Sequence, residues 1–167
     1  RLYAVNASEN HDEFMCSLEQ AGMYVMVALA HDCPTCAITK SSAPDCYPRE
    51  LHQQGINVIN AFAKYNNTLA FSAGNEVNHV VSSPQDNAPC QKKFIADMRK
   101  YIASCSGSSG NNGGGGREGK TIMRRIPVGL VLADTDRRGN AMYYNCVDDD
   151  DDDSGGDNGH QDQSNDQ

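Results

Sequence analysis

The stretch that decides the fold is LAFSAGNEVNH, which spans residues 69–79. An apolar run leads through small residues into a polar pair, Asn75 and Glu76. The apolar run is typical of a buried strand, and a buried strand does not accommodate an unpaired charge. A carboxylate does fit where a strand ends at a cleft, because functional groups of parallel α/β folds gather at the carboxyl ends of the strands. The pair is therefore a candidate functional site.

The rest of the chain alternates between strand-like and helix-like segments. Apolar runs predict strands, and apolar residues that recur every three or four positions predict helices. The strands are expected at residues 2–5, 24–30, 68–73 and 126–132, and the helices at 11–21, 50–65 and 92–104. This alternation is the pattern of βαβ units, so the predicted fold class is α/β with a parallel sheet.

The acidic balance of the chain comes from its last part. The formal net charge is -8, and residues 148–153 are all aspartates. The remainder is close to neutral and has no basic stripe, so no nucleic-acid partner is expected. The longest apolar run, residues 23–30, is too short for a membrane helix, which needs about 20 apolar residues.

One domain is predicted for residues 1–147, with a flexible glycine-rich insertion at 106–119, followed by a disordered acidic tail at 148–167. The first residues already read as a strand, so the chain is expected to begin inside a domain. The seven cysteines leave at least one unpaired within the chain. Sequons for N-glycosylation begin at Asn6 and Asn66, which favours a secreted protein.

The residue types of the Asn75–Glu76 pair suit the cleavage of a glycosidic bond. A glutamic acid can donate a proton to the leaving sugar oxygen, and a neighbouring amide can hydrogen-bond the 2-hydroxyl of the sugar. The alternative is a solvated loop carboxylate at the end of a strand, because an Asn-Glu dipeptide alone is a common sequence.

Several words in the sequence, taken in order, resemble one enzyme family. They are RLYAVN (1–6), NHDEFM (10–15), AGMYV (21–25), FAKYNNTLAFSAGNEV (62–77), FIADMRKYIAS (94–104) and RRIPVG (124–129). The collinear set is similar to the β-1,3-glucanosyltransferases of glycoside hydrolase family 72, the elongases that remodel glucan in fungal-type cell walls. The resemblance extends to about Cys146 and omits only the glycine-rich insertion and the tail.

The resemblance implies a (β/α)8 TIM barrel, of which this chain would supply about four of the eight strand–helix units. It implies an enzyme that cuts an internal β-1,3-glucan linkage with retention and transfers the donor chain to an acceptor glucan. Glu76 would be the general acid/base, and Asn75 and Tyr3 would bind substrate. No metal or organic cofactor is implied. Such proteins are secreted to the outer face of the plasma membrane or the cell wall, and any lipid anchor would lie outside this chain.

The sequence departs from the family pattern at several functional positions. The family nucleophile is a glutamate in a SEYG-like motif, and no such motif occurs here. Ala28 stands in place of an aspartate, Leu130 in place of a tyrosine, and Phe14 in place of a cysteine, with Cys16 close by. The alternatives are therefore an inactive fragment that at most binds β-glucan, and a β-glucan hydrolase of the same clan.

The cysteines after the second expected strand allow two further hypotheses. Cys33 and Cys36 form a CxxC motif that could serve redox chemistry. Together with His31 and Cys46 they could also bind zinc by residue type. The simpler interpretation is a disulfide or free thiols in a long loop.

Four isolated polar residues and one acidic run complete the candidates. His11 and His79 are expected at the surface or behind the site. Asp134 and Asp136 follow the last expected strand and either line the cleft or cap a loop. The aspartates at 148–153 lack the spacing of a calcium loop and are expected to be solvated.

Overall fold

The computed structural model describes residues 1–30, 37–38, 45–80, 84–106, 123–135 and 137–144. Within these ranges three parallel strands form one sheet, in the order β1 (Val25–Ala28), β2 (Thr68–Asn75) and β3 (Val128–Val131). The central strand β2 pairs with both neighbours, so that Phe71 lies opposite Val27 on one side and Val128 on the other. The fold is α/β, as the sequence predicts.

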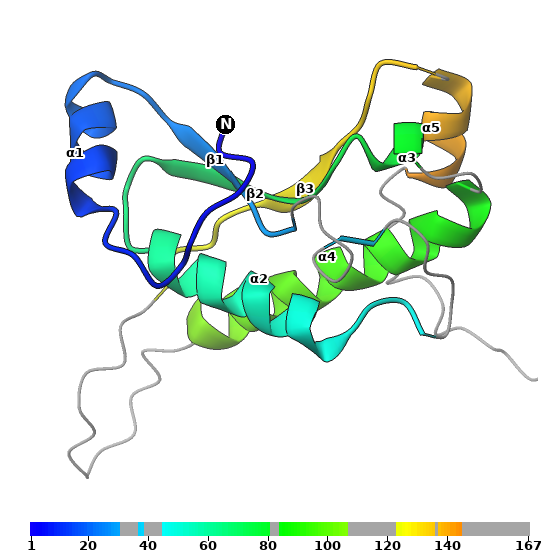
Figure 1. Ribbon diagram of the computed structural model, residues 1–167, viewed down its shortest axis with the longest axis horizontal. Coiled ribbons are helices and arrows are strands. Elements are labelled where there is room, and N and C mark those ends of the chain that lie inside the picture. Colours follow the sequence, from blue (N-terminus) through cyan, green and yellow to red (C-terminus); the bar gives the residue numbers. More distant parts are fainter. Residues whose placement is uncertain (31–36, 39–44, 81–83, 107–122, 136, 145–167) are drawn as a thin grey trace, which may run out of the picture.

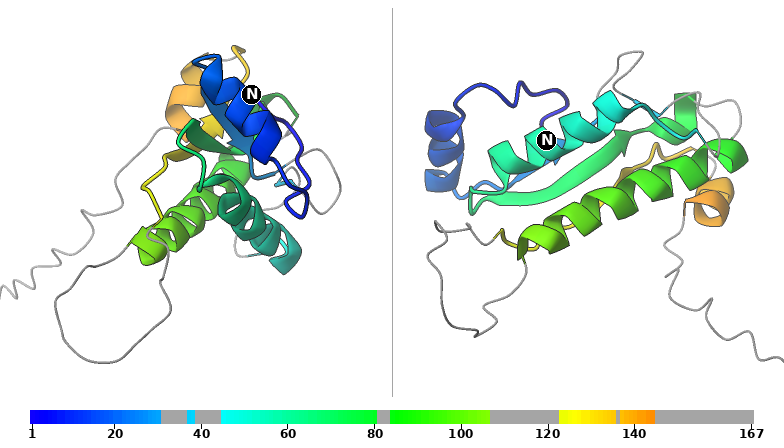
Figure 2. Two further views of the ribbon diagram at one scale, coloured as in Figure 1. Left: turned by 90° about the vertical axis from the view of Figure 1, so that its left-hand side faces the viewer. Right: turned by 90° about the horizontal axis from the view of Figure 1, so that it is seen from below.

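Five helices accompany the sheet in the described residues. They are α1 (Asp12–Gln20), α2 (Arg49–Phe62), α3 (Val77–Val80), α4 (Pro84–Ser106) and α5 (Arg137–Tyr143). The long helices α2 and α4 lie on the same face of the sheet (Figures 1 and 2). The short helices α3 and α5 lie together at the carboxyl end of β2, and α1 lies toward the opposite end (Figure 1).

The core lies between the sheet and the two long helices. Val27, Phe71 and Val128, which lie opposite one another on the three strands, are buried there. Helix α2 contributes a single apolar stripe, because its buried positions recur at helical spacing: Leu51, Gly55, Val58, Ile59 and Phe62. Gly55 lets α4 approach closely, since a Cβ at this position would lie 2.6 Å from Met98 Sδ.

Most of the elements expected from the sequence are confirmed, with ends shifted by a few residues. The expected strand at 2–5 is an exception, because only Leu2 is paired, in a single parallel bridge to Val27. The Leu2 N–H donates to the Met26 carbonyl at 2.9 Å, and the Ala28 N–H donates to the Leu2 carbonyl at 3.0 Å. The first residues nevertheless lie beside the edge of β1, where a further parallel strand would lie.

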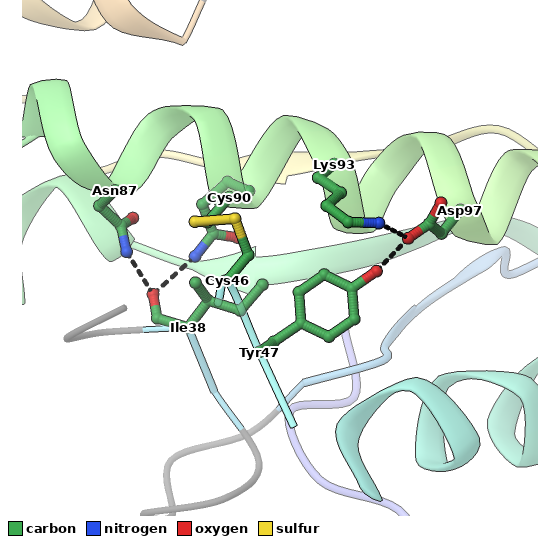
Figure 3. The surroundings of a disulfide bond; sticks show 8 residues. Ile38, Cys46, Tyr47, Asn87, Cys90, Lys93 and Asp97 are labelled. Atoms are coloured by element: carbon green, nitrogen blue, oxygen red, sulfur yellow. Dashed lines mark hydrogen bonds and ion pairs between the residues drawn. A yellow bond between two sulfur atoms is a disulfide. The ribbon is translucent and has the colours of Figure 1, made fainter. Parts of the chain in front are cut away.

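The helix expected at 92–104 begins earlier than the sequence indicates. Helix α4 begins eight residues earlier, at Pro84, where the missing N–H of proline costs no helical hydrogen bond. Pro89 removes one bond inside the helix, but tertiary contacts hold this turn in place. Asn87 and Gln91 both donate their side-chain amides to the carbonyl of Ile38, at 2.8 and 2.7 Å (Figure 3). These long-range bonds override the local propensity for a loop.

A disulfide between Cys46 and Cys90 joins the segment before α2 to the first half of α4 (Figure 3). Both cysteines are buried. The bond contradicts the zinc hypothesis, because Cys46 has no free thiolate to offer a metal. The described residues also contain no group of three or more metal-ligating side chains. A disulfide is one of the two states that the sequence leaves open for Cys46, and it is confirmed, with a partner, Cys90, that lies outside that long loop, in α4.

A polar cluster lies next to the disulfide (Figure 3). The Tyr47 hydroxyl donates to Asp97, and Lys93 forms an ion pair with the same carboxylate at 2.6 Å. Partial burial raises the pKa of Asp97, but the hydrogen bonds from Lys93 and Tyr47 outweigh it and the pKa is lowered overall. Burial and the bond to Asp97 raise the pKa of Tyr47, so its phenol stays protonated at neutral pH.

Several predictions fall outside the described residues. They concern the CxxC cysteines and His31, Asp136, the glycine-rich insertion beyond Ser106, and the acidic tail. Among the helices that the structure describes, none combines the length and apolar character needed to cross a membrane.

Candidate active site

Asn75 ends β2, and Glu76 follows it at the carboxyl end of the sheet. Asn75 pairs with Val131 of β3, and the Glu76 N–H donates to the Val131 carbonyl at 2.6 Å. Glu76 has φ of +51°, in the left-handed region that costs a residue with a Cβ about 1–2 kcal/mol. Both side chains are exposed. Backbone strain held by tertiary contacts at an exposed carboxylate supports the hypothesis of a functional residue there.

Gly74 allows the helices to pack closely behind this strand end. A Cβ at Gly74 would lie 2.7 Å from Val77 Cγ1, closer than real Cβ contacts come, and 3.2 Å from Gln91 Oε1. The Ser72 hydroxyl donates to the Gly74 carbonyl at 2.6 Å. Only glycine therefore fits between α3 and α4 at this point, directly before Asn75.

Arg1 connects the other predicted site residues. Its Nη2 donates to Asn75 Oδ1 at 2.6 Å, and its guanidinium carbon lies 4.3 Å from the centre of the Tyr3 ring. A guanidinium has only hydrogen-bond donors, so the Asn75 atom that accepts from Arg1 is the amide oxygen. The amide nitrogen Nδ2 then lies on the other side of the Asn75 amide group. The Asn75 amide thus keeps its Nδ2 as a donor for another group. Tyr3 is 57% exposed and offers an accessible aromatic ring.

The side chain of Asn78, in the helix α3 that follows β2, hydrogen-bonds to the loop that follows β3. Its Nδ2 donates to the Ala133 carbonyl at 3.0 Å and to Asn140 Oδ1 at 2.8 Å, while its Oδ1 accepts from the Ala133 N–H at 2.8 Å. Asn140 Nδ2 donates to the same Ala133 carbonyl at 3.1 Å. This network fixes α3, which directly follows Glu76, against α5.

A small apolar cluster lies beneath the same loops. Val77, Ala88 and Tyr144 are buried together, with Leu130 packed against them. Burial raises the pKa of the Tyr144 phenol, which keeps it neutral. Leu130, which the sequence resemblance places where the family pattern has a tyrosine, packs against this cluster with an apolar side chain.

Comparison with known proteins identifies the family. The family profile described as "Glucanosyltransferase", of glycoside hydrolase family 72, matches residues 1–161. The chain belongs to glycoside hydrolase family 72. The assignment agrees with the words quoted from the sequence, which include the strand that ends in Asn75 and Glu76.

Curated members of family 72 match most of this chain but only part of their own length. The 1,3-beta-glucanosyltransferase gel1 of Aspergillus fumigatus is 35% identical over 149 residues, which are 87% of this chain and 28% of gel1. The 1,3-beta-glucanosyltransferase PGA4 of Candida albicans is 35% identical over 151 residues, 89% of this chain and 29% of PGA4. The chain thus spans less than a third of these relatives.

A solved family 72 structure has a similar fold. Saccharomyces cerevisiae Gas2p in complex with laminaripentaose matches with a TM-score of 0.65 and 28% identity. The match covers 87% of this chain and 29% of the Gas2p chain. The parallel α/β arrangement described above is therefore that of part of a family 72 enzyme.

The structure brings three of the predicted family 72 site residues into one neighbourhood. Tyr3 and Asn75 share Arg1 as a partner, and Glu76 adjoins Asn75 in the chain. Arg1 itself was missed, because no sequence pattern indicates that an N-terminal residue reaches the end of β2. Asn78 was also missed, although it stands two residues after Glu76 in the same polar word.

Among the remaining predicted polar residues, His79 contacts the backbone of this pair. His11 Nε2 donates to the Asn6 carbonyl at 2.9 Å and the ring stacks on Phe62, so His11 anchors the start of α1. His79 is exposed, and its backbone N–H donates to the Glu76 carbonyl at 2.9 Å. Asp134 is exposed in the loop after β3.

Proposed function

We propose that this chain is part of a secreted β-1,3-glucanosyltransferase and contributes the acid/base half of its active site. Its strands would form about four of the eight units of a (β/α)8 barrel, with Glu76 at the mouth. The observation that carries the proposal is the exposed Asn75–Glu76 pair at the carboxyl end of β2, oriented by Arg1. The names of the family 72 relatives support the choice of reaction.

Each site residue has a role in the proposed transfer. Glu76 donates a proton to the departing glucan oxygen, and then removes a proton from the hydroxyl of the acceptor chain. Asn75 donates its amide N–H to the 2-hydroxyl of the donor sugar, since Arg1 already occupies the amide oxygen. Tyr3 offers its ring to a sugar face beside the pair. No metal or organic cofactor takes part in this scheme.

Retention requires a second carboxylate about 5–5.5 Å from the first, which acts as the nucleophile. The sequence contains no SEYG-like motif to supply it. The proposal therefore assigns the nucleophile to a part of the enzyme beyond these 167 residues. The same observation favours one second candidate function, which is β-glucan binding without turnover. Hydrolysis by a β-glucanase of the same clan is distinguished from transfer by its products.

The first test is incubation of the chain with laminari-oligosaccharides, followed by product analysis and binding measurement. Longer products indicate transfer, exclusively shorter products indicate hydrolysis, and binding without conversion indicates the second candidate. Glu76→Gln should abolish any conversion, whereas Glu13→Gln on the exposed side of α1 should not. Activity that survives Glu76→Gln contradicts the assignment of the acid/base.

A second test does not need the missing nucleophile. An α-laminaribiosyl fluoride carries its own leaving group in the orientation of a glycosyl-enzyme intermediate. The acceptor hydroxyl attacks the anomeric carbon, fluoride leaves, and Glu76 takes the hydroxyl proton. A β-1,3-linked product that depends on Glu76 would support the role of general base. Arg1→Met should weaken acceptor transfer and oligosaccharide binding, because the Asn75 amide then loses its fixed orientation.

A further inference from the structure

The turn between α2 and β2 presents an exposed asparagine. Asn66 begins the sequence Asn66-Asn67-Thr68, an acceptor pattern for N-linked glycosylation. The Asn66 carbonyl accepts from Arg124 at 3.4 Å. In the described part of the chain, no hydrogen bond engages the Asn66 side chain. Its amide is therefore available for modification without loss of a native contact.

A depression with a mixed polar and apolar lining adjoins this asparagine. A cavity of about 170 Å³ is lined by Asn66 together with Glu19, Gly22, Met23, Tyr24 and Asn67. Tyr24 is 70% exposed and Met23 is 55% exposed. Asn67 holds this segment in place, since its Nδ2 donates to the carbonyls of Met15 and Met23 at 2.9 and 3.4 Å. The lining thus combines the apolar side chains of Met23 and Tyr24 with the polar side chains of Glu19, Asn66 and Asn67.

A lining that offers both apolar and polar side chains suits the two sides of a pyranose. The C–H face of a sugar packs on an aromatic ring, while its hydroxyl and acetamido groups remain in contact with water and polar side chains. A sugar attached to Asn66 would start at the edge of the cavity. It would cover two large apolar side chains that are otherwise exposed to solvent.

We propose that Asn66 carries an N-linked glycan whose first N-acetylglucosamine lies over Met23 and Tyr24. The proposal rests on the secretory passage that is part of the proposed function. In the transfer, Asn66 Nδ2 forms a bond to C1 of a lipid-diphosphate-linked oligosaccharide and loses a proton. The bond from C1 to the diphosphate oxygen breaks, and the lipid diphosphate leaves.

The position is compatible with an active site at the other end of the sheet. The turn precedes the first residue of β2, and Asn75 is its last residue. A strand of this length separates them by roughly 23 Å at about 3.3 Å per residue. The glycan would therefore leave the Asn75–Glu76 pair accessible.

The second sequon provides a matched control. Asn6 is also exposed, but its side chain is already engaged: Nδ2 donates to Glu9 at 3.0 Å, and Oδ1 accepts from the backbone and hydroxyl of Ser8. A sugar on Asn6 would have no part in covering Tyr24. Asn66→Gln is preferable to a change at Thr68, because the buried Thr68 hydroxyl donates to the Phe62 carbonyl at 2.8 Å.

The first experiment is to express the full chain with a secretory leader in a eukaryotic host that adds high-mannose glycans. Release of the glycan by a peptide amidase that hydrolyses the Asn–sugar bond should convert Asn66 to aspartate, as seen by peptide mass spectrometry. Asn66→Gln should remove that modification, and Asn6→Gln should not. A secreted chain with unmodified Asn66 overturns the proposal.

The second experiment tests the packing of the first sugar. An endoglycosidase that leaves one N-acetylglucosamine should preserve the thermal midpoint, and complete removal should lower it by about 2–5 °C. In Tyr24→Ala both treatments should give the same midpoint, and in Asn6→Gln the wild-type difference should remain. The proposed packing is overturned if complete removal of the glycan lowers the thermal midpoint equally in wild type and in Tyr24→Ala. Neither experiment uses glucan, so a negative result here does not contradict the proposed transferase activity. A negative result in the glucan assays likewise does not contradict the proposed glycan.

Discussion

Removal of the Cys46–Cys90 disulfide should destabilise the fold by an amount that the loop length determines. The two cysteines are 44 residues apart in sequence. The chain-entropy relation for a closed loop of this size gives about 4 kcal/mol at 25 °C. Domains of ordinary size have free energies of unfolding of about 5–15 kcal/mol in total, so the loss is large. The double variant Cys46→Ala/Cys90→Ala avoids leaving a single buried thiol.

Urea unfolding followed by circular dichroism measures the effect. With a slope of about 2 kcal/mol per molar urea, the midpoint should fall by about 2 M. Adding a reductant should lower the midpoint of the wild-type protein and leave that of the double variant unchanged. The exposed Cys16 provides a control, since Cys16→Ser should change the midpoint little. A double variant within about 1 kcal/mol of wild type would refute the loop-closure argument.

Three further substitutions test the packing, the loop network and the electrostatics. Gly74→Ala forces a Cβ against Val77 and should lower the free energy of unfolding in urea by about 1–3 kcal/mol, with weaker oligosaccharide binding. An unchanged free energy of unfolding would contradict the close contact between Gly74 and Val77. Asn78→Ala leaves the Ala133 N–H without its partner and leaves the Ala133 carbonyl with Asn140 as its partner, so it should cost about 1–3 kcal/mol, with faster hydrogen exchange at residues 128–135 as the diagnostic. Because the folded pKa of Asp97 is lowered from 3.8, its stabilisation is complete above that value and is lost as the pH falls through the lowered pKa. The difference in unfolding free energy between wild type and Asp97→Asn should therefore stay constant near neutral pH and shrink as the pH falls below 3.8, and a difference that stays constant there would count against this assignment.

The sequence predicted those elements whose signals are local. The run at 24–30 is apolar almost throughout, and helix 50–65 has an apolar stripe at helical spacing, so neither needs a distant contact to be recognised. The placement of Asn75 and Glu76 at a strand end also followed from local pattern. The collinear words added the family, which the family profile confirms.

Helix α4 shows where local reasoning failed. Its first eight residues are rich in residues typical of loops, and they are helical because distant groups hold them. Asn87 and Gln91 bond to Ile38, and Cys90 is joined to Cys46. No pattern within residues 84–91 contains that information. A change at Ile38 or Cys46 would thus act on a helix some forty residues away.

The sequence by itself determined the α/β alternation, the exposed carboxylate after β2 and the family, because each depends on residues close together in the chain. Only the tertiary structure decided that Arg1 orients the Asn75 amide, that Asn78 ties two loops together and that Cys46 pairs with Cys90. These contacts join residues 44 to 74 positions apart. Which distant groups meet is decided by the register of the parallel strands and the packing of the two long helices, and neither is encoded in any short segment.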